Sequence, residues 1–596
     1  MRVKLALPGR GDRSTRPDHR ALGGLVGLVC GLLALGPALR PGYLLFYDMV
    51  FVPRLAFSDR TMGVDGSVPR AVPNDFDVAV LSHLAPGWVV QKVLLIGVFV
   101  AVGAGAAGLM RTRLGAVAAA LVAAWNPYLA ERLAIGHWGY LLGYACVPFL
   151  VSAAAGCRSG AVRGRFRLGV WLVVLAFTGS TGAVFGLIAV LAVLLAPGPR
   201  PSWHRSMRDI GWALLIWLLA DATWWFSYLF LAPTPPGGSA GVTAFMARAD
   251  TPYGVIGSLL TGGGIWNQGV WFSARSSVVV SGLALLVVVV AVVVAVRRRV
   301  WRQSPALAGL GIAGVICLVL AGASALPGGS HVMTILGNDL PGGGLLRDAQ
   351  KFDAVWMILV AVLAGQLVER TRDLGIRVGA QRSTALVFAA ALAAWPLITL
   401  TGMAWGAWGR WQAVDYPASY VHTAQQIDRL PPGGVAVFPW TQYRSYAWDG
   451  HRVLLDPWQR LVSRQVLVND ALPLTSGVVP GDDPDARKVT QALADHGDVA
   501  AVLRSVGVRY VLVETDQPVA AGLPNLAGDR VLVAADGLRL YDLGPVHVSG
   551  GHDGPFRYTG WLLAGMSVLL VGVAGVSAGR SATGPPAGTS ARHEDL

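Results

Sequence analysis

Residues 276–302 read SSVVVSGLALLVVVVAVVVAVRRRVWR, an apolar run that ends in a cluster of four arginines. An uncharged run of about 20 residues is the length that a helix needs to cross a bilayer. Arginine-rich connectors stay on the cytoplasmic side of the membrane by the positive-inside rule. This stretch therefore predicts both a transmembrane helix and its direction.

The same alternation of apolar runs and basic connectors repeats along the chain. It predicts about twelve spans, at 21–39, 87–109, 114–126, 139–155, 168–180, 182–196, 210–231, 276–296, 306–325, 354–369, 383–402 and 558–578. The short connectors 111–113, 158–167, 200–208, 297–302 and 370–382 are rich in arginine and fall on one side together with the basic amino terminus. We expect a multi-pass protein of the plasma membrane with cytoplasmic N and C termini.

The composition supports this class. Of the 596 residues 54% are hydrophobic and 14% charged, with a mean hydropathy of +0.53, whereas soluble domains have about 25% charged residues. The formal net charge of +14 is assigned to membrane topology, so nucleic-acid binding is not expected. Three of the four cysteines lie in apolar runs and the fourth begins a basic connector, which leaves no disulfide framework.

The predicted organisation is an α-helical polytopic domain with a small extracytoplasmic α/β domain. The parts are a cytoplasmic basic tail (1–20), a transmembrane domain (21–402), the α/β domain (403–557), a last transmembrane helix (558–578) and a disordered cytoplasmic tail (579–596). Residues 168–196 are too short for two full spans, so we expect a tight hairpin or a pair of short helices there. Asp536-Gly537 predicts a hairpin between strands 530–534 and 538–542, and helices are expected at 418–429 and 487–507.

Asp48 is the strongest candidate for catalysis on the outer side. It lies in GYLLFYDMVF (42–51), a few residues beyond the first span. A carboxylate among aromatic and aliphatic residues at the membrane surface is costly unless it has a role or a partner, and a general base is one such role. A helix cap or an interface charge is the alternative.

Further along the first outer loop, Asp75 and Asp77 form a pair of acids in PNDFD (73–77). Two carboxylates beside an amide can hold a divalent cation such as Mg, Mn or Ca. Ordinary solvated loop acids are the other interpretation.

A second polar group, from Asn126 to His137, is a candidate lining for a cleft or an acceptor site. It contains Asn126, Glu131, Arg132 and His137. Alternatively, Glu131 and Arg132 neutralise each other and His137 belongs to an aromatic belt at the interface.

Arg347 and Lys351 are two cations on the outer side, four residues apart, so they share a helix face if the following helix starts early. Either Asp348 and Asp353 compensate them, or they bind a lipid phosphate.

In the α/β domain, FPWTQYRSYAW (438–448) contains Trp440 and Trp448, candidates for sugar contacts. Packing of the domain against the membrane helices is the equally weighted alternative.

The sequence contains no Walker loop, HExxH or CxxC motif. ATP-driven pumps, soluble-nucleotide enzymes and zinc peptidases therefore lose support.

In combination these features resemble the GT-C superfamily of membrane glycosyltransferases, which take sugars from polyprenyl phosphates. The resemblance is greatest to the membrane region of actinobacterial arabinofuranosyltransferases and covers roughly residues 20–400. It rests on Asp48 in an acidic first loop, APGWVVQK (85–92), NPY (126–128) followed by GHW (136–138), Trp224-Trp225, and LRDAQKF (346–352). The sequence departs from the family pattern in one respect, because Asp48 and Asp75 are well separated.

The resemblance implies transfer of a sugar, arabinofuranose or mannose, from a polyprenyl-phosphate donor to a cell-envelope glycan or glycolipid in cell wall biogenesis. It implies inversion of the anomeric centre, with Asp48 as general base and Arg347 and Lys351 at the leaving phosphate. It names no certain cofactor. A flippase or transporter of lipid-linked envelope precursors is one alternative, which predicts ionisable residues deep in several helices; only Asp221 is of this kind. A non-catalytic scaffold for envelope assembly is the other.

Overall fold

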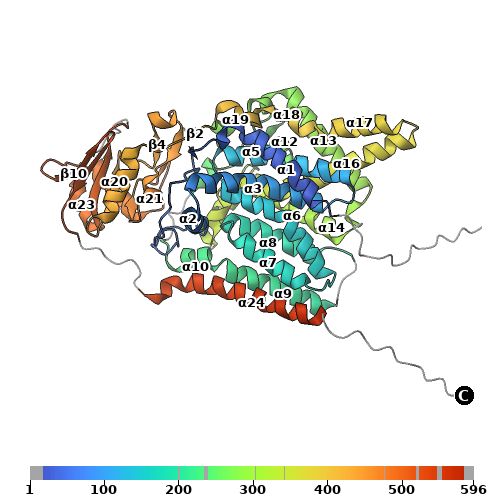
Figure 1. Cartoon of the computed structure of the whole chain (residues 1–596), viewed down its shortest axis with the longest axis horizontal. Coiled ribbons are helices and arrows are strands. Elements are labelled where there is room, and N and C mark those ends of the chain that lie inside the picture. The colour runs from blue at the N-terminus through green and yellow to red at the C-terminus, as the bar shows by residue number, and fades with distance from the viewer. Residues whose placement is uncertain are drawn as a thin grey trace, which may run out of the picture.

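The computed structural model shows a bundle of helices with an α/β domain at one end (Figure 1). It describes residues 18–198, 202–233, 239–302, 304–340, 342–474, 477–517, 523–546 and 554–582. Most of the predicted tails, 1–20 and 579–596, therefore lie outside the described residues.

Eight helices of the described chain are long and apolar enough to cross a membrane, or nine if the bent pair α9 (Trp203–Ala220) and α10 (Ala222–Phe230) is one span. The eight segments are Arg20–Leu39, Gly87–Gly108, Trp138–Arg158, Val278–Arg297, Pro305–Ala323, Ala349–Arg377, Arg382–Thr399 and Pro555–Gly579. They contain α1 (Arg20–Leu35), α3 (Gly87–Gly108), α6 (Trp138–Arg158), α13 (Val278–Arg297), α14 (Pro305–Ala323), α16 (Asp353–Arg377), α17 (Arg382–Ala393), α18 (Trp395–Thr399) and α24 (Thr559–Ala582).

The prediction of about twelve spans counted three shorter helices. α4 (Arg113–Ala124), α7 (Gly164–Ala176) and α8 (Ser180–Leu195) have 12, 13 and 16 residues. At 1.5 Å per residue none reaches the roughly 30 Å of a hydrocarbon core. Residues 168–196 accordingly form a pair of short helices, with a break before Gly179, whose φ is +85°.

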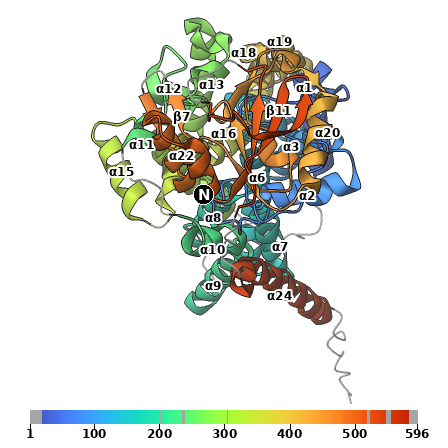
Figure 2. The same cartoon turned by 90° about the vertical axis from the view of Figure 1, so that its left-hand side faces the viewer.

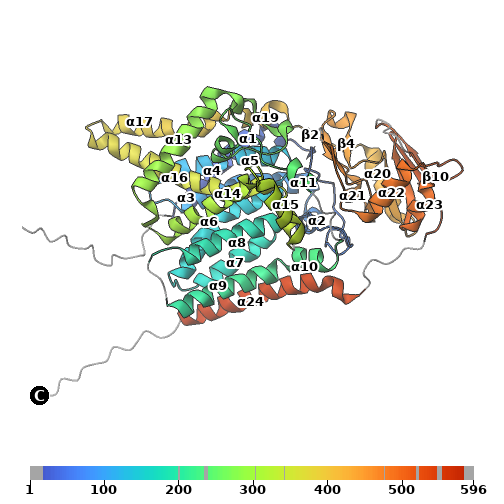
Figure 3. The same ribbon diagram turned by 180° about the vertical axis from the view of Figure 1, so that it is seen from behind.

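The centre of the bundle is α16, the most buried of the candidate spans, which packs against α4, α14 and α17. On one side α1 packs on α3 so closely that a Cβ on Gly27 would lie 2.1 Å from the carbonyl oxygen of Phe99. Small residues permit this approach of two backbones inside a membrane. On another side, α24 runs along α9, α10 and α7 (Figure 3).

The α/β domain, seen from its own side in Figure 2, contains a mixed five-stranded sheet in the order β10-β11-β9-β3-β6. Its strands are β3 (Gly434–Phe438), β6 (Val466–Leu467), β9 (Val508–Glu514), β10 (Arg530–Ala535) and β11 (Leu538–Asp542). β3 is parallel to β6 and β9, and β11 is antiparallel to β9 and β10. The hairpin expected at Asp536-Gly537 joins β10 to β11, with Ala535 opposite Leu538.

The helices of this domain are α20 (Ala418–Arg429), α22 (Pro484–Ala494) and α23 (Val499–Ser505). The single helix expected at 487–507 is divided because Asp498 caps the start of α23, accepting a hydrogen bond from the Ala501 backbone N–H at 2.9 Å. Smaller pieces complete the domain: β4 (Tyr443–Ser445), β5 (Val453–Leu455), α21 (Trp458–Leu461), β7 (Leu472–Leu474) and β8 (Gly477–Val479).

The loop after α1 fastens the bundle to the α/β domain. Its strand β1 (Tyr43–Leu44) pairs antiparallel with β2 (Ala413–Val414), and the carbonyl of Tyr47 accepts from the Leu455 backbone N–H at 2.9 Å. From the bundle side, the Gln91 amide donates to the carbonyl of Leu44 and its oxygen accepts from the Leu44 N–H, both at 2.8 Å. Asp48 is therefore held at the junction of the two parts.

Candidate active site

Asp48 and His137 meet at this junction. The Nε2 of His137 lies 2.9 Å from Oδ2 of Asp48. The Asp48 side chain is 39% exposed and that of His137 only 11%. The carboxylate is thus open to a substrate on one side while the imidazole fixes it from the other.

Backbone contacts hold Asp48 against the turn between α5 (Pro127–Ala134) and α6. The Asp48 N–H donates to the carbonyl of Ile135 at 3.1 Å. Gly136, next in the chain, has a φ of +91°, and a Cβ there would lie 2.2 Å from the backbone nitrogen of Met49. Only glycine permits both this conformation and this approach, so Gly-His at 136–137 places the imidazole beside the carboxylate.

Arg132 fixes the tautomer of His137. Nη1 of Arg132 lies 2.9 Å from Nδ1 of His137. A guanidinium has donors only, so Nδ1 must accept and the proton of a neutral imidazole must be on Nε2. This N–H points at Asp48. The result is a directed series of hydrogen bonds from Arg132 through His137 to an ionised carboxylate.

Arg132 is itself held in a fixed orientation. It is fully buried, and its two terminal nitrogens bind Asp348 bidentately, Nη1 to Oδ2 at 2.7 Å and Nη2 to Oδ1 at 3.0 Å. The side-chain oxygen of Gln350 also accepts from Nη2, and its amide donates to the Gly263 carbonyl at 2.9 Å. Burial opposes ionisation of Asp348, but the charge and hydrogen bonds of Arg132 prevail and lower the pKa of Asp348.

Arg347 and Lys351 are left without acidic partners. In the described parts of the chain no acid lies within ion-pairing distance of either cation, since Arg132 binds Asp348 and the buried oxygens of Asp353 make no hydrogen bond. Arg347 lies 5.3 Å from the ring centre of Phe245, and the ammonium of Lys351 lies 5.4 Å from that of Tyr140. Asp348 is near enough to act electrostatically on both cations, but neither Asp348 nor Asp353 forms an ion pair with them among the described residues.

The two cations precede the long helix and do not share its face. The 3-10 turns η5 (Gly343–Leu346) and η6 (Ala349–Phe352) occupy this segment, and α16 begins only at Asp353. Lys351 is buried, and its backbone carbonyl accepts from the hydroxyl of Tyr128 at 2.8 Å. Tertiary contacts, rather than helix periodicity, position these side chains: Lys351 contacts α5 and α6, and Arg347 contacts Gly241 and Phe245 at α11 (Ala240–Ala244).

Sequence reasoning missed two residues that face the same region. Burial lowers the pKa of Arg347, and the nearby charge of Arg70 lowers that pKa further, so Arg70 is a third cation in this region. Arg70 forms an ion pair with Asp482. Burial raises the pKa of Tyr443, and the Asp48 carboxylate raises it further, which places a phenol of the α/β domain near Asp48. Tyr443 lies within the aromatic stretch 438–448 and Arg70 lies in the first outer loop, five residues before Asp75, but no local pattern distinguishes them from their neighbours.

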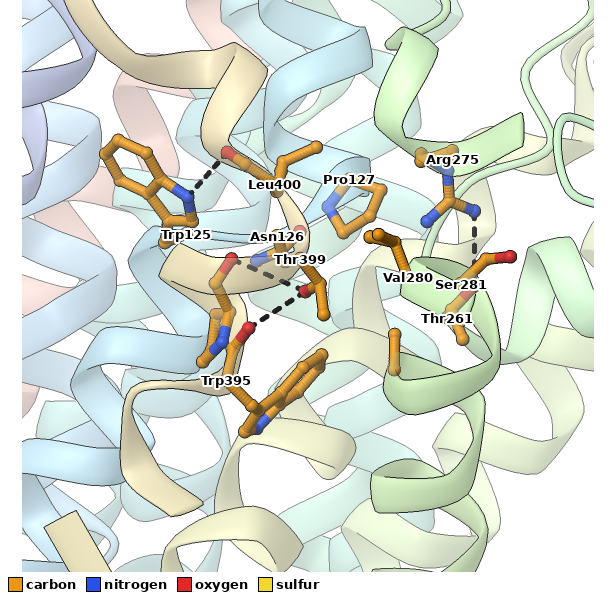
Figure 4. A pocket seen from close by; sticks show the side chains of 12 residues that line it. Trp125, Asn126, Pro127, Thr261, Arg275, Val280, Ser281, Trp395, Thr399 and Leu400 are labelled. Carbon is orange, nitrogen blue, oxygen red and sulfur yellow. Dashed lines mark hydrogen bonds between the residues drawn. The ribbon is translucent and has the colours of Figure 1, made fainter. Parts of the chain in front are cut away.

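Glu131 and Asn126 lie on the other side of α5. Glu131 is buried, and its Oε1 lies 3.6 Å from Nε of Arg275. Arg275 also binds Asp250 and donates a hydrogen bond to the hydroxyl of Thr261 at 3.1 Å. Beneath Arg275 is a cavity of about 10 Å³ (Figure 4), room for a single water. Asn126 caps α5, accepting from the Leu129 N–H at 3.0 Å. Of the four predicted cleft residues, the structure brings only Arg132 and His137 to Asp48.

Asp75 and Asp77 do not fit a metal site. Oδ2 of Asp75 lies 3.1 Å from Nη2 of Arg460, and the described residues contain no group of three His, Cys, Asp or Glu side chains able to hold a metal ion. Burial, and then the charge of Asp75, raises the pKa of Asp77 to about 8. Asp75 instead links α2 (Asn74–Leu84) to the α/β domain.

The acceptor role predicted for Trp440 and Trp448 requires correction. Trp440 is 7% exposed within the core of the α/β domain, and its Nε1 donates to the hydroxyl of Thr490 at 2.9 Å. Trp448 packs against Tyr416, Tyr420 and Tyr446, with ring centres 4.8 to 5.7 Å apart. Both indoles are packing residues, which was the alternative interpretation of this stretch.

Comparison with known proteins identifies solved structures with a similar fold. No protein-family model matches the chain, and no curated protein matches it. The cryo-EM structure of arabinofuranosyltransferase AftD from Mycobacteria matches with a TM-score of 0.52 and 17% identity, over 91% of this chain and 40% of that one. A mutant of AftD matches with a TM-score of 0.50 and 16% identity, over 90% and 42%. The chain thus spans about two fifths of the structures it matches, and it shares its fold with the corresponding part of AftD, an arabinofuranosyltransferase, as the sequence resemblance predicted.

Proposed function

We propose that this protein is a membrane glycosyltransferase that moves a sugar from a polyprenyl-phosphate donor to a cell-envelope glycan or glycolipid, with Asp48 as the general base. The observation that carries the proposal is the series Arg132–His137–Asp48, which presents an accessible carboxylate in a fixed orientation. A catalytic base needs this combination of fixed orientation and access. The shared fold is consistent with it, and arabinofuranose, named by the matched enzyme, is the first sugar to test.

In the proposed reaction the acceptor hydroxyl gives its proton to the free oxygen of Asp48. The hydroxyl oxygen forms a bond to the anomeric carbon of the donor sugar from the face opposite the phosphate. The bond between that carbon and the phosphate oxygen breaks, and its electron pair leaves with the polyprenyl phosphate. This single displacement inverts the anomeric centre. His137 keeps the second oxygen of Asp48 hydrogen-bonded throughout.

The leaving phosphate requires positive charge where its own charge develops. Arg347 and Lys351 are assigned this role because the buried lysine and the largely desolvated arginine have no acid of their own. A guanidinium binds phosphate bidentately, and an ammonium acts as a point charge. Fixed cations shielded from water stabilise such charge better than mobile surface ones.

The direct test is Asp48→Asn in the full-length protein, supplied with a polyprenyl-phosphate sugar and an acceptor. We expect transfer to fall by about 10²–10⁴-fold while donor binding persists, because the amide keeps the shape but accepts no proton. The matched control is Asp65→Asn, an equal charge change in the same loop, where the carboxylate accepts local hydrogen bonds from the backbone N–H and the hydroxyl of Ser67. Near-normal transfer by Asp48→Asn contradicts the proposal and favours a flippase or an assembly scaffold, for which Asp48 is dispensable.

The proposal also places the α/β domain outside the plasma membrane, with both termini in the cytoplasm. All four native cysteines are buried, so a new surface cysteine can be labelled selectively. A membrane-impermeant maleimide should label Asp536→Cys, at the exposed hairpin tip, in intact cells. Ser159→Cys, exposed in a basic connector, should react only after lysis. The reverse result moves Asp48 to the wrong side of the membrane.

A further inference from the structure

A strongly basic hollow lies at the C-terminal end of α24, the end of that helix that points away from the α/β domain in Figure 1. It has a volume of about 680 Å³ and is formed by the last turn of α6, the starts of α7 and α9, and the end of α24. We call it the basic hollow and define it by its charged lining residues, Arg163, Arg165, His204, Arg205, Arg208 and Asp209. No residue of the proposed active site contributes to it.

The charges of the basic hollow are unbalanced. Its lining has four arginines and one acid, Asp209. Asp209 is buried, and it binds Nε of Arg165 at 2.6 Å and lies 3.8 Å from Nε of Arg205. Both contacts use Nε, so Asp209 orients these two guanidinium groups without occupying their terminal nitrogens. Arg163 and Arg208 have no acid within ion-pairing distance among the described residues.

Apolar side chains also line the basic hollow and continue beyond it along α9 and α24. Phe166 and Trp212 line it, and the indole N–H of Trp212 donates to the carbonyl of Arg165 at 3.1 Å. Further along α9 and α24 the side chains exposed to the surroundings are aliphatic, with Leu218 46% and Val573 67% exposed. A ligand seated here meets cations at the membrane surface and hydrocarbon beneath them.

We propose that the basic hollow binds an anionic phospholipid, with the phosphate at Arg163 and Arg208 and the acyl chains along α9 and α24. Guanidinium groups hold phosphate oxygens bidentately, and basic pockets between transmembrane helices on the cytoplasmic side suit such headgroups. The continuous path from unpaired arginines to lipid-facing aliphatic residues favours a lipid over a soluble anion. The proposal does not depend on Asp48 or on sugar transfer.

The test measures lipid binding to the full-length protein in a neutral detergent. The probes are dioctanoyl phosphatidylglycerol and dioctanoyl phosphatidylcholine, counted by native mass spectrometry over a concentration series. We expect phosphatidylglycerol to bind more tightly, and Arg163→Gln with Arg208→Gln to weaken it about 10–30-fold without affecting phosphatidylcholine. The matched control is Arg297→Gln with Arg298→Gln, an equal loss of exposed charge in another basic connector, which should leave binding unchanged.

Three results overturn the proposal. The first is equal phosphatidylglycerol affinity in the wild type and the hollow variant. The second is an equal loss in the control variant, which indicates diffuse surface charge. The third is displacement of the lipid by inorganic phosphate at similar concentration, which assigns the hollow to a soluble phosphate group. If the double variant does not fold, Arg208→Gln alone should still weaken binding about fivefold.

Discussion

The role of His137 can be measured separately from that of Asp48. His137 contacts Asp48 and Arg132, but in the proposed reaction it neither accepts the proton of the acceptor hydroxyl nor binds the leaving phosphate. Its N–H donates to an ionised carboxylate at 2.9 Å, and a hydrogen bond to a charged group contributes about 1.5–3 kcal/mol. Loss of that amount from the transition state lowers turnover about 10–150-fold. Asp48 is 39% exposed, so water can replace the donor in part, and we expect His137→Ala to lie near the tenfold end.

The assay is transfer from a polyprenyl-phosphate sugar by the full-length protein, with kcat and KM measured separately. His137→Ala should lower kcat and leave the KM for donor nearly unchanged. His137→Gln should recover much of the loss, because its amide nitrogen reaches the position of Nε2 and donates a hydrogen bond to Asp48. A residue that only supports the fold is not rescued in this way.

The double variant Asp48→Asn with His137→Ala distinguishes positioning from direct catalysis. If His137 acts through the carboxylate, the double variant has the activity of Asp48→Asn alone, since the second change removes nothing further. If the two losses multiply instead, His137 acts directly on the substrate and the reasoning from the series Arg132–His137–Asp48 is refuted.

Two further predictions concern other charged groups. Arg347→Ala and Lys351→Ala should each weaken donor binding and slow transfer. If both cations face one phosphate, the effects should be non-additive in the double variant. If both single variants keep the donor affinity and turnover of the wild type, the two cations have only a structural role. Glu514 shares the guanidinium of Arg444 with Asp456 in the core of the α/β domain, and burial raises the pKa of Glu514 to about 7 in spite of Arg444. A carboxyl whose pKa is raised in the folded state stabilises the fold at acidic pH and loses this contribution as pH rises from the unfolded pKa of 4.5 to the folded pKa of about 7, by about 1.4 kcal/mol for each tenfold difference in proton affinity between the two states. Hydrogen exchange of β9, corrected for the intrinsic rise of exchange with pH, should therefore show a loss of protection over that range in the wild type and much less in Glu514→Gln.

Much of the helical bundle was predictable because hydrophobic length is a local property. Each of the twelve predicted spans is largely helical, and the hairpin at Asp536-Gly537 forms in the expected register. The number of full spans was less predictable, since α4, α7 and α8 are apolar but short. Whether a short apolar helix crosses the membrane depends on the helices that pack against it. Those helices come from other parts of the chain, so the hydrophobicity of the segment alone does not decide it.

The pairing of charges was only partly predictable. Adjacency in sequence suggests that Arg132 neutralises Glu131, yet consecutive residues of a helix point in directions about 100° apart and do not face each other. On α5 the two side chains accordingly point in different directions, and Glu131 pairs with Arg275 while Arg132 pairs with Asp348. Helix geometry alone argued against the adjacent pair, but the partners come from segments more than a hundred residues away and required the fold.

The aromatic stretch 438–448 shows a different limit. Sugar-binding surfaces and domain cores both use tryptophan and tyrosine, so composition cannot separate them. Contacts separate them here: Trp440 is buried in the core of the α/β domain, and the half-buried Trp448 packs against Tyr416, Tyr420 and Tyr446.

The distribution of buried charge gives the strongest physical reason to expect an anionic ligand at the junction. Arg132, Arg275 and Arg444 are each buried and each bound to at least one carboxylate. Lys351, 4% exposed, has no such partner among the described residues. The charge of Asp348 offsets part of the cost of burying Lys351, but Arg132 already binds that carboxylate bidentately. Under the proposed function, the phosphate of the donor would supply further negative charge here, so part of the remaining cost of burying Lys351 would become part of the affinity for the donor.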